Sequence, residues 1–117
     1  MSPQALIYKI EAAEVWRAAQ AAGVYQGSSL DVADGFIHFS TAAQFEATLA
    51  KWFRGRGGLL VAAIDAASLG DALRYEPARG GDLFPHLYAP LPMTAVRWTK
   101  AIPDLPDGGH APGALEA

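Results

Sequence analysis

The chain has 117 residues, 51% of which are apolar, and its formal net charge is −3. A chain of this length can form one hydrophobic core and is too short for two domains. Proteins that bind nucleic-acid backbones usually carry an excess of basic residues, and this chain does not. We therefore expect no nucleic-acid partner. The absence of cysteine excludes a disulfide framework, a thiolate nucleophile and a zinc–cysteine site.

Nothing in the sequence predicts a secretion signal or a membrane span. The N-terminus has no charged leader followed by an apolar run and a cleavage site. The longest apolar run, residues 59–64, is far shorter than the roughly 20 residues that cross a bilayer as a helix. We therefore expect a soluble, cytoplasmic protein with no membrane partner, and the sequence leaves its oligomeric state open.

The first part of the chain predicts a strand and a helix. In the strand, residues 5–10, Tyr8 interrupts an apolar run, so one strand face is expected to reach solvent or a cleft. Apolar side chains at helical spacing then predict a helix over residues 11–22, and Gly23 is a natural stop. Residues 24–34 are expected to be less regular, with Tyr25 on a short extended piece and Gly27, Ser28 and Ser29 in a loop.

The segment of residues 35–41 carries the first histidine. Side chains alternate across a strand, so His38 and Ser40 are expected on one face while Ile37 and Phe39 face the core. The segment therefore predicts a histidine and a hydroxyl that point together into a cleft.

A regular helix is expected next. Thr41 and Gln44 have the spacing of a capping box, and glycines from Gly55 onward end the helix. Its apolar side chains form a stripe that is expected in the core: Phe45, Leu49, Trp52 and Phe53. Residues 59–64 show no alternation, which is typical of a strand buried on both faces.

The second half of the chain predicts short strands separated by turns. Residues 73–76 are expected to form a strand that is followed by a glycine-rich loop. In the next strand, residues 84–88, His86 and Tyr88 share one face. Pro85 indicates the start of a strand or the edge of a sheet, because proline cannot donate a ladder hydrogen bond.

The coarse pattern indicates the fold class. Two helices lie early in the chain and strands dominate later, including one expected within residues 93–102, so we expect an α+β fold with a mixed, mostly antiparallel sheet. The domain is expected to span residues 1–103. Residues 104–117 are rich in Pro, Gly, Asp and Ala and are expected to be a disordered tail.

Two histidines are the main candidates for chemistry. His38 lies two residues from Ser40, and His86 lies two residues from Tyr88. Imidazole suits acid–base work because it changes its charge near neutral pH. The alternative is that each histidine is hydrogen-bonded and merely holds a loop. The matching surroundings favour a shared site, for which Glu76 is the best-placed carboxylate in the middle of the chain.

Two other kinds of site have weaker support. His38 and His86 could bind a metal with Glu76 or Asp82, but there is no closely spaced ligand pair such as His-x-x-x-His, so no metal is expected. Ser40 stands at a strand-to-helix junction, as a hydrolase nucleophile would. The flanking Gly-x-Ser-x-Gly pattern is absent.

The most distinctive segments are Gly35–Ser40 (GFIHFS) and Phe84–Tyr88 (FPHLY). They are accompanied by Leu6-Ile7-Tyr8, Trp16, Gly23-Val24-Tyr25, Gln44, Tyr75-Glu76 and Ala89-Pro90-Leu91. With these residues the chain resembles, over nearly its whole expected domain, the bacterial family called domain of unknown function 952. The resemblance implies a compact α+β domain with no established biochemical activity.

The order of the elements resembles, more distantly, the ADP-ribosyltransferase fold. That fold has a strand with an aromatic-His-Gly motif, a Gly-Ile-Tyr-Phe strand before a helix, and a late strand that opens with the catalytic glutamate. Residues 7–9, 35–40 and 84–88 would occupy these positions. Here the first segment has no histidine, His38 replaces the tyrosine, and His86 stands where the glutamate is expected.

These differences bear on the chemistry. Cleavage of a nicotinamide–ribose bond builds positive charge on the sugar, which a carboxylate stabilises better than a neutral imidazole does. The resemblance therefore implies a cleft of the nucleotide-binding type with a different set of reactive side chains. It leaves NAD or another nucleotide open as the cofactor.

We therefore expect a small enzyme that acts on, or binds, a nucleotide-like metabolite in an ADP-ribosyltransferase-like cleft. The expected catalytic residues are His38, His86, Ser40 and Glu76, and the expected ligand-binding residues are Tyr8, Tyr25, Gln44 and Tyr88. The alternatives are a non-catalytic ligand-binding or interaction module and a metal-dependent hydrolase. The sequence leaves open the substrate, the reaction and whether the protein is catalytic.

Overall fold

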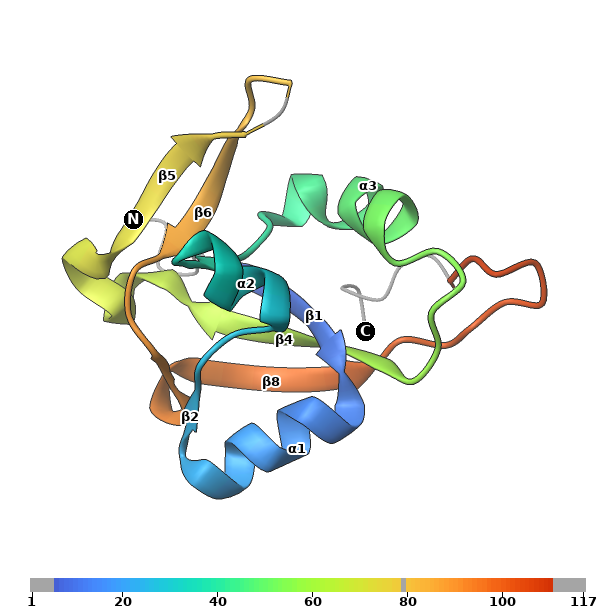
Figure 1. Ribbon diagram of the computed structural model, residues 1–117, viewed down its shortest axis with the longest axis horizontal. Coiled ribbons are helices and arrows are strands. Elements are labelled where there is room, and N and C mark those ends of the chain that lie inside the picture. Colours follow the sequence, from blue (N-terminus) through green and yellow to red (C-terminus); the bar gives the residue numbers. More distant parts are fainter. Residues whose placement is uncertain (1–5, 79, 111–117) are drawn as a thin grey trace.

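The computed structural model describes residues 6–78 and 80–110. Its elements, with 3-10 helices labelled η, are β1 (Leu6–Ala12), α1 (Ala13–Ala22), β2 (Val24–Tyr25), α2 (Ser29–Asp34), β3 (Ile37–His38), α3 (Ala42–Trp52), β4 (Leu59–Asp65), η1 (Ala66–Ala72), β5 (Leu73–Pro77), β6 (Leu83–Leu87), β7 (Leu91–Pro92), η2 (Met93–Ala95) and β8 (Val96–Ala101). The strands of every pair run antiparallel (Figure 1). The expected α+β class with antiparallel pairing is confirmed.

The strands form three sheets instead of the single sheet expected. Their orders are β1-β4-β8, β3-β6-β5 and β2-β7. Two backbone hydrogen bonds join Tyr8 of β1 to Ser40, just beyond β3, with N···O distances of 2.8 and 2.9 Å. This bridge fixes the place where the first and second sheets meet, and it brings the end of β3 beside β1.

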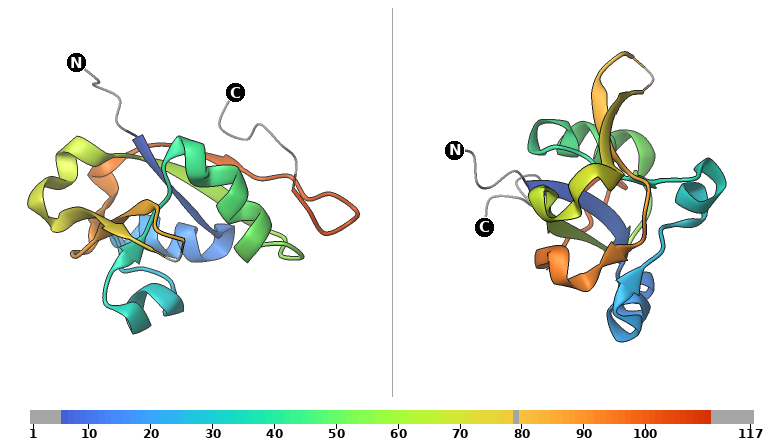
Figure 2. Two further views of the ribbon diagram at one scale, coloured as in Figure 1. Left: turned by 90° about the horizontal axis from the view of Figure 1, so that it is seen from above. Right: turned by 90° about the vertical axis from the view of Figure 1, so that its left-hand side faces the viewer.

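The first sheet separates two parts of the core. Because side chains alternate along β1, Ile7 and Tyr8 point to opposite faces. Ile7 belongs to the cluster that contains Trp16 of α1, whereas Tyr8 packs in the cluster that contains Phe45 of α3. Figures 1 and 2 show α1 and α3 on opposite sides of this sheet. The central strand β4 is buried on both faces, as its sequence predicts.

The helix α1 begins later than expected and ends where expected. β1 continues through Ala12, so the helix starts at Ala13 and not at residue 11. Gly23 ends the helix in the left-handed conformation, with φ 83°, and its N–H donates to Ala19 and Gln20. Glycine adopts this conformation without the steric cost that a Cβ would add.

The helix α3 has the predicted capping contact but a smaller apolar face. The side chain of Gln44 accepts a hydrogen bond from the backbone N–H of Thr41 at 3.0 Å. Phe45 and Leu49 are buried. The prediction that Trp52 lies in the core is wrong: 58% of it is exposed, and the Lys51 ammonium lies 5.3 Å from the centre of its ring. Phe53 is partly buried against the same core cluster as Phe45 and Leu49.

A short helix, α2, replaces the irregular loop that was expected before residue 35. Ser28 and Asp31 form a reciprocal capping box: each side chain accepts the other residue's backbone N–H. Gly35 closes the helix with φ 88°. This helix matters for the site because it ends directly before the histidine strand.

The hairpin of β5 and β6 projects from the body of the molecule (Figure 1). The expectation that Pro85 marks a strand start or a sheet edge is wrong, since Pro85 lies within the middle strand of its sheet. The neighbouring strand β3 ends at His38, and Pro85 contributes its carbonyl to the N–H of Phe39 at 3.0 Å. The ladder ends at this residue, so the missing donor is tolerated.

The C-terminal segment differs from the expected disordered tail as far as residue 110. Residues 104–110 form a turn closed by a bridge between Asp104 and His110. Arg54 donates to the carbonyl of Asp107 at 3.0 Å and ties this turn to the end of α3. The remainder of the expected tail, residues 111–117, lies outside the described residues. Within the described part of the chain, no helix is long and apolar enough to cross a membrane.

Candidate functional site

Strand pairing brings the two predicted histidines together. In the antiparallel ladder of β3 and β6, His38 lies directly opposite His86. The centroids of the two imidazoles are 5.4 Å apart, and the ring planes meet at 69°. Two segments that are distant in the sequence thus contribute one imidazole each to a single spot on the sheet.

The ring of Phe36 lies against both imidazoles. Its centroid is 4.6 Å from that of His38 and 4.1 Å from that of His86, on which it stacks at 29°. The ring of Tyr88 lies 5.2 Å from Phe36. The side chain of His86 is 8% exposed and that of His38 is 31% exposed. The pair is therefore sheltered by aromatic rings but open to solvent on the side of His38.

Two carboxylates of α2 hold the imidazole of His38. Its Nδ1 lies 2.6 Å from Oδ1 of the buried Asp31, and its Nε2 lies 3.0 Å from Oδ2 of the exposed Asp34. Ionised carboxylates only accept hydrogen bonds. Both contacts are therefore satisfied together when each nitrogen of His38 carries a proton.

The carboxylate of Asp31 accepts hydrogen bonds from Lys9, Ser28 and His38. Its Oδ2 accepts from Nζ of Lys9 and from the N–H of Ser28, both at 2.8 Å. Its Oδ1 accepts from the backbone N–H of His38 at 3.1 Å, as well as from the ring. Burial alone would raise the pKa of Asp31, but the hydrogen bond from His38 and the charge of Lys9 outweigh it and hold the pKa well below its usual range.

The imidazole of His86 is held by one carboxylate. Its Nδ1 lies 2.8 Å from Oε1 of Glu76 on the neighbouring strand β5, and the same oxygen accepts from the Tyr88 hydroxyl at 2.6 Å. The hydrogen bonds from Tyr88 and His86 lower the pKa of Glu76, and the bond to Glu76 raises the pKa of Tyr88. None of the hydrogen bonds among the described residues involves Nε2 of His86, so this nitrogen is available as an acceptor when Nδ1 keeps the proton.

A second buried polar contact lies on the same face of β1 as Lys9. The hydroxyl of Tyr25 donates to Oε2 of the buried Glu11 at 2.5 Å. Burial and the hydrogen bond to Glu11 raise the pKa of Tyr25 far above its usual value. The ammonium of Lys9 lies 6.0 Å from the centre of the Tyr25 ring. Two buried polar contacts, Lys9–Asp31 and Tyr25–Glu11, therefore start from one face of β1, and the first of them reaches His38.

The structure brings together only some of the residues predicted for the site. His38, His86, Glu76 and Tyr88 form one cluster. Ser40 is buried, and its hydroxyl donates to Thr48 on α3 at 3.2 Å.

The other expected ligand-binding residues have structural contacts. Tyr8 is buried between the rings of Phe45 and Trp98, with centroid distances of 6.3 and 6.1 Å. Gln44 donates to the carbonyl of Leu83 at 2.7 Å. Tyr25 lies below the surface, bound to Glu11.

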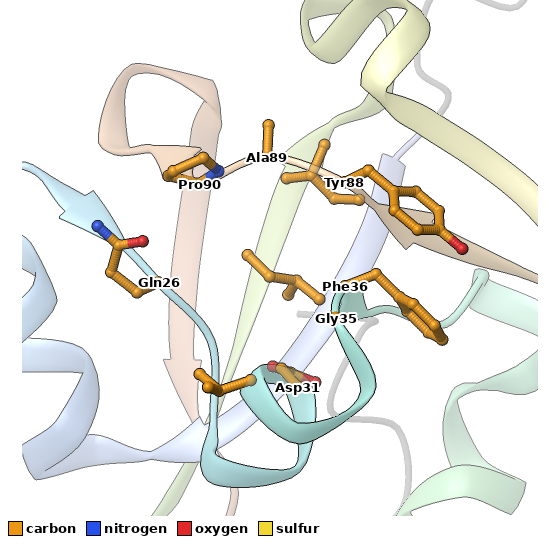
Figure 3. A pocket seen from close by; sticks show the side chains of 10 residues that line it. Gln26, Asp31, Gly35, Phe36, Tyr88, Ala89 and Pro90 are labelled. Carbon is orange, nitrogen blue, oxygen red and sulfur yellow. The ribbon is translucent and has the colours of Figure 1, made fainter.

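A shallow hollow of about 220 Å³ adjoins the aromatic rings, between α2 and the segment after β6. Figure 3 shows Gln26 and Pro90 on one side of it and the rings of Phe36 and Tyr88 on the other. Neither histidine lines this hollow, but Phe36 and Tyr88 belong to both it and the imidazole cluster. Its size suits only part of a ligand, because sites for drug-sized molecules measure about 300–1,000 Å³.

The family model described as "Protein of unknown function (DUF952)" matches residues 10–99, which is most of the chain. The chain belongs to the DUF952 family. No functionally curated protein matches it. The family resemblance expected from the sequence is thereby confirmed.

Solved structures of another protein show the same fold. The crystal structure of protein CC0527 from Caulobacter crescentus is 44% identical, with a TM-score of 0.89, and the match covers 94% of this chain and 96% of that one. A crystal structure of a double mutant of CC0527 gives the same values. The solution structure of CC0527 is 46% identical, with a TM-score of 0.79, and covers 89% and 90% of the two chains.

Several residues of this DUF952 site were not expected from the sequence. Lys9 was missed because it lies far from the histidine strands in the sequence, and Asp31 and Asp34 were missed because they lie in the segment that was expected to be irregular. The spacing of Ser28 and Asp31, which fits a capping box, was the available signal for α2. Within the described part of the chain, no group of three or more His, Asp or Glu side chains is arranged to hold a metal ion.

Proposed function

We propose that this DUF952 protein is a small enzyme that uses His38 and His86 for proton transfer on a nucleotide-like metabolite. The observation that carries the proposal is the facing pair of imidazoles, each fixed through Nδ1 by its own carboxylate. A carboxylate on Nδ1 holds the ring in one orientation and one tautomer, which is how a catalytic imidazole is commonly prepared.

The two imidazoles have different hydrogen-bond partners, and this difference indicates a separate role for each histidine. With carboxylate oxygens at both ring nitrogens, His38 is suited to donate a proton. With Nδ1 bound to Glu76 and Nε2 not hydrogen-bonded within the described chain, His86 is suited to accept one. Pairs of titratable groups in contrasting environments are a common source of acid and base in one site. Such a pair serves hydrolysis, elimination or isomerisation of a small molecule.

The proposed ligand class follows from the aromatic side chains and from the distant resemblance, expected from the order of elements in the sequence, to the ADP-ribosyltransferase fold. Phe36 and Tyr88 provide faces on which a flat base could stack. The carboxylate of Glu76 stands beside His86, so this strand pair does offer a negative group to a developing positive charge. We propose NAD or another nucleotide as the first class to test, in a cytoplasmic protein that acts on small molecules rather than on nucleic acid.

The alternative is a non-catalytic ligand-binding or interaction module in which the histidines hold the sheet. It is favoured by the low exposure of His86 and by the ring of Phe36 stacked upon it. In this case a ligand would contact the aromatic rings, and no proton would be transferred.

A ligand screen followed by two variants separates these functions. Thermal shift against NAD, ADP-ribose, nucleotides and sugar phosphates identifies a ligand, because binding raises the melting temperature by mass action. For the enzyme, His38→Ala and His86→Ala should each reduce turnover by about 100-fold or more while affinity changes little. Unchanged turnover in both variants, measured beside His110→Ala as a control outside the cluster, would contradict the enzyme.

A further inference from the structure

Lys9 is a buried lysine that takes no direct part in the proton transfer proposed for His38 and His86. Only 7% of it is exposed. Its Nζ donates to Oδ2 of Asp31 at 2.8 Å and to the backbone carbonyl of His38 at 3.0 Å. Lysines are almost never fully buried unless they are paired. Lys9 therefore reaches from β1 to two elements of the histidine site.

Stability is a poor explanation for this ion pair. Two buried charges lose their hydration, and apolar residues of similar volume are often as stabilising or more so. Burial lowers the pKa of Lys9, although the charge of Asp31 opposes this shift. Ile7, two residues earlier on the same face of β1, packs in the core, so an apolar residue at position 9 would continue the pattern of the strand.

Asp31 connects Lys9 to His38 through its two oxygens. Oδ2 is occupied by Lys9 and by the N–H of Ser28. This fixes the plane of the carboxylate and turns Oδ1 toward the backbone N–H and ring Nδ1 of His38. Removal of the ammonium would leave Oδ2 with the Ser28 N–H as its remaining donor and so loosen the orientation of the carboxylate.

We propose that Lys9 is a positioning residue of the site: it orients Asp31 so that the His38 imidazole keeps its proton on Nδ1 and turns Nε2 toward Asp34 and the solvent. This inference rests on the proposed function for its catalytic meaning. The positioning itself concerns the ring of His38 and can be measured without a substrate.

The first test replaces Lys9 with methionine in the full chain. Nitrogen and proton spectra of the imidazoles report which ring nitrogen carries the proton. In Lys9→Met the Nδ1–H of His38 should lose its fixed hydrogen bond to Asp31 and its signal should broaden, whereas His86, held by Glu76, should keep its signals. Lys51→Met, on the exposed face of α3, should leave both rings unchanged.

A folded Lys9→Met protein with unchanged His38 signals would overturn the proposal. If this variant does not fold, the wild-type protein answers the same question at rising pH. The groups that face Lys9 are Asp31 of α2, Glu11 of β1, and Tyr25 of β2. The His38 ring signals should shift in step with loss of the Lys9 proton, and deprotonation of Lys9 without any change at His38 would equally overturn the proposal.

Turnover distinguishes failure of this inference from failure of the proposed function. A misplaced catalytic group costs about 100-fold in rate, so Lys9→Met should lower kcat by about that factor when its His38 Nδ1–H signal is broadened. A broadened His38 Nδ1–H signal with unchanged kcat would support the positioning role of Lys9 and contradict the catalytic role of His38.

Discussion

At the scale of single residues, Asp31 does more than any other side chain to define the candidate site. It caps α2, holds the backbone and the ring of His38, and neutralises Lys9. These contacts join β1, α2 and β3 at one buried carboxylate. The geometry of the histidine pair therefore depends on a residue that is itself almost inaccessible to solvent.

The contact of Tyr25 with Glu11 can be tested separately. Tyr25→Phe removes only the hydroxyl and leaves Oε2 of the buried Glu11 without its donor. An unpaired buried polar group costs about 1–3 kcal/mol, so we expect a loss of that size in the free energy of unfolding in urea. Tyr75→Phe, at an exposed tyrosine, is the matched control and should be neutral. Equal stability of both variants would show that the buried bond contributes nothing.

The sequence predicts whether a residue is buried where the alternation of side chains along a strand is enough to decide it. Side-chain alternation over residues 36–40 places Ile37 and Phe39 in the core, where the structure has them. It could not reveal that Ser40 is covered by α3 or that Lys9 is buried, because both facts depend on elements that come from elsewhere in the chain.

At the scale of elements, Gln44 at the N-terminus of α3 makes both a local capping hydrogen bond and a long-range hydrogen bond. The capping position of Gln44 is visible in the sequence, because it depends on residues three apart. Its second bond, from Nε2 to the carbonyl of Leu83, is not visible there. Through this bond α3 supports the strand β6 that carries His86.

We predict that Gln44→Ala lowers the free energy of unfolding by about 1 kcal/mol, the usual worth of such hydrogen bonds. The same change should increase amide hydrogen exchange at the start of β6, because its tie to α3 is lost. Gln20→Ala, on the exposed face of α1, is the control and should change neither quantity. A ligand-binding role alone would instead leave exchange in β6 unaltered.

At the scale of the whole molecule, the fold class was accessible from the sequence but the division into sheets was not. A run of apolar residues predicts β4 as a buried strand, whatever its neighbours are. The pairing of β3 with β6, and the Tyr8–Ser40 bridge that docks this pair on β1, require contacts between distant segments. Hydrophobic patterns do not specify such partners.

Acid should destabilise the whole molecule through Asp31. Its pKa is lower in the folded protein than in the unfolded chain, where it is about 3.9. The unfolded state therefore binds more protons in acid, and the free energy of unfolding should fall as the pH drops below about 5. Urea unfolding at several pH values measures this. Asp31→Asn should show a flatter dependence, and an identical slope in both proteins would contradict the assignment.

His38 and His86 are proposed to act as one catalytic unit, and a double-mutant cycle on turnover measures their coupling. Groups that serve one reaction are strongly non-additive when they are removed. We predict that the double variant with His38→Ala and His86→Ala loses little more activity than the more damaging single variant does. If the two losses simply multiply, the two imidazoles act independently, and the shared catalytic role proposed for them is wrong.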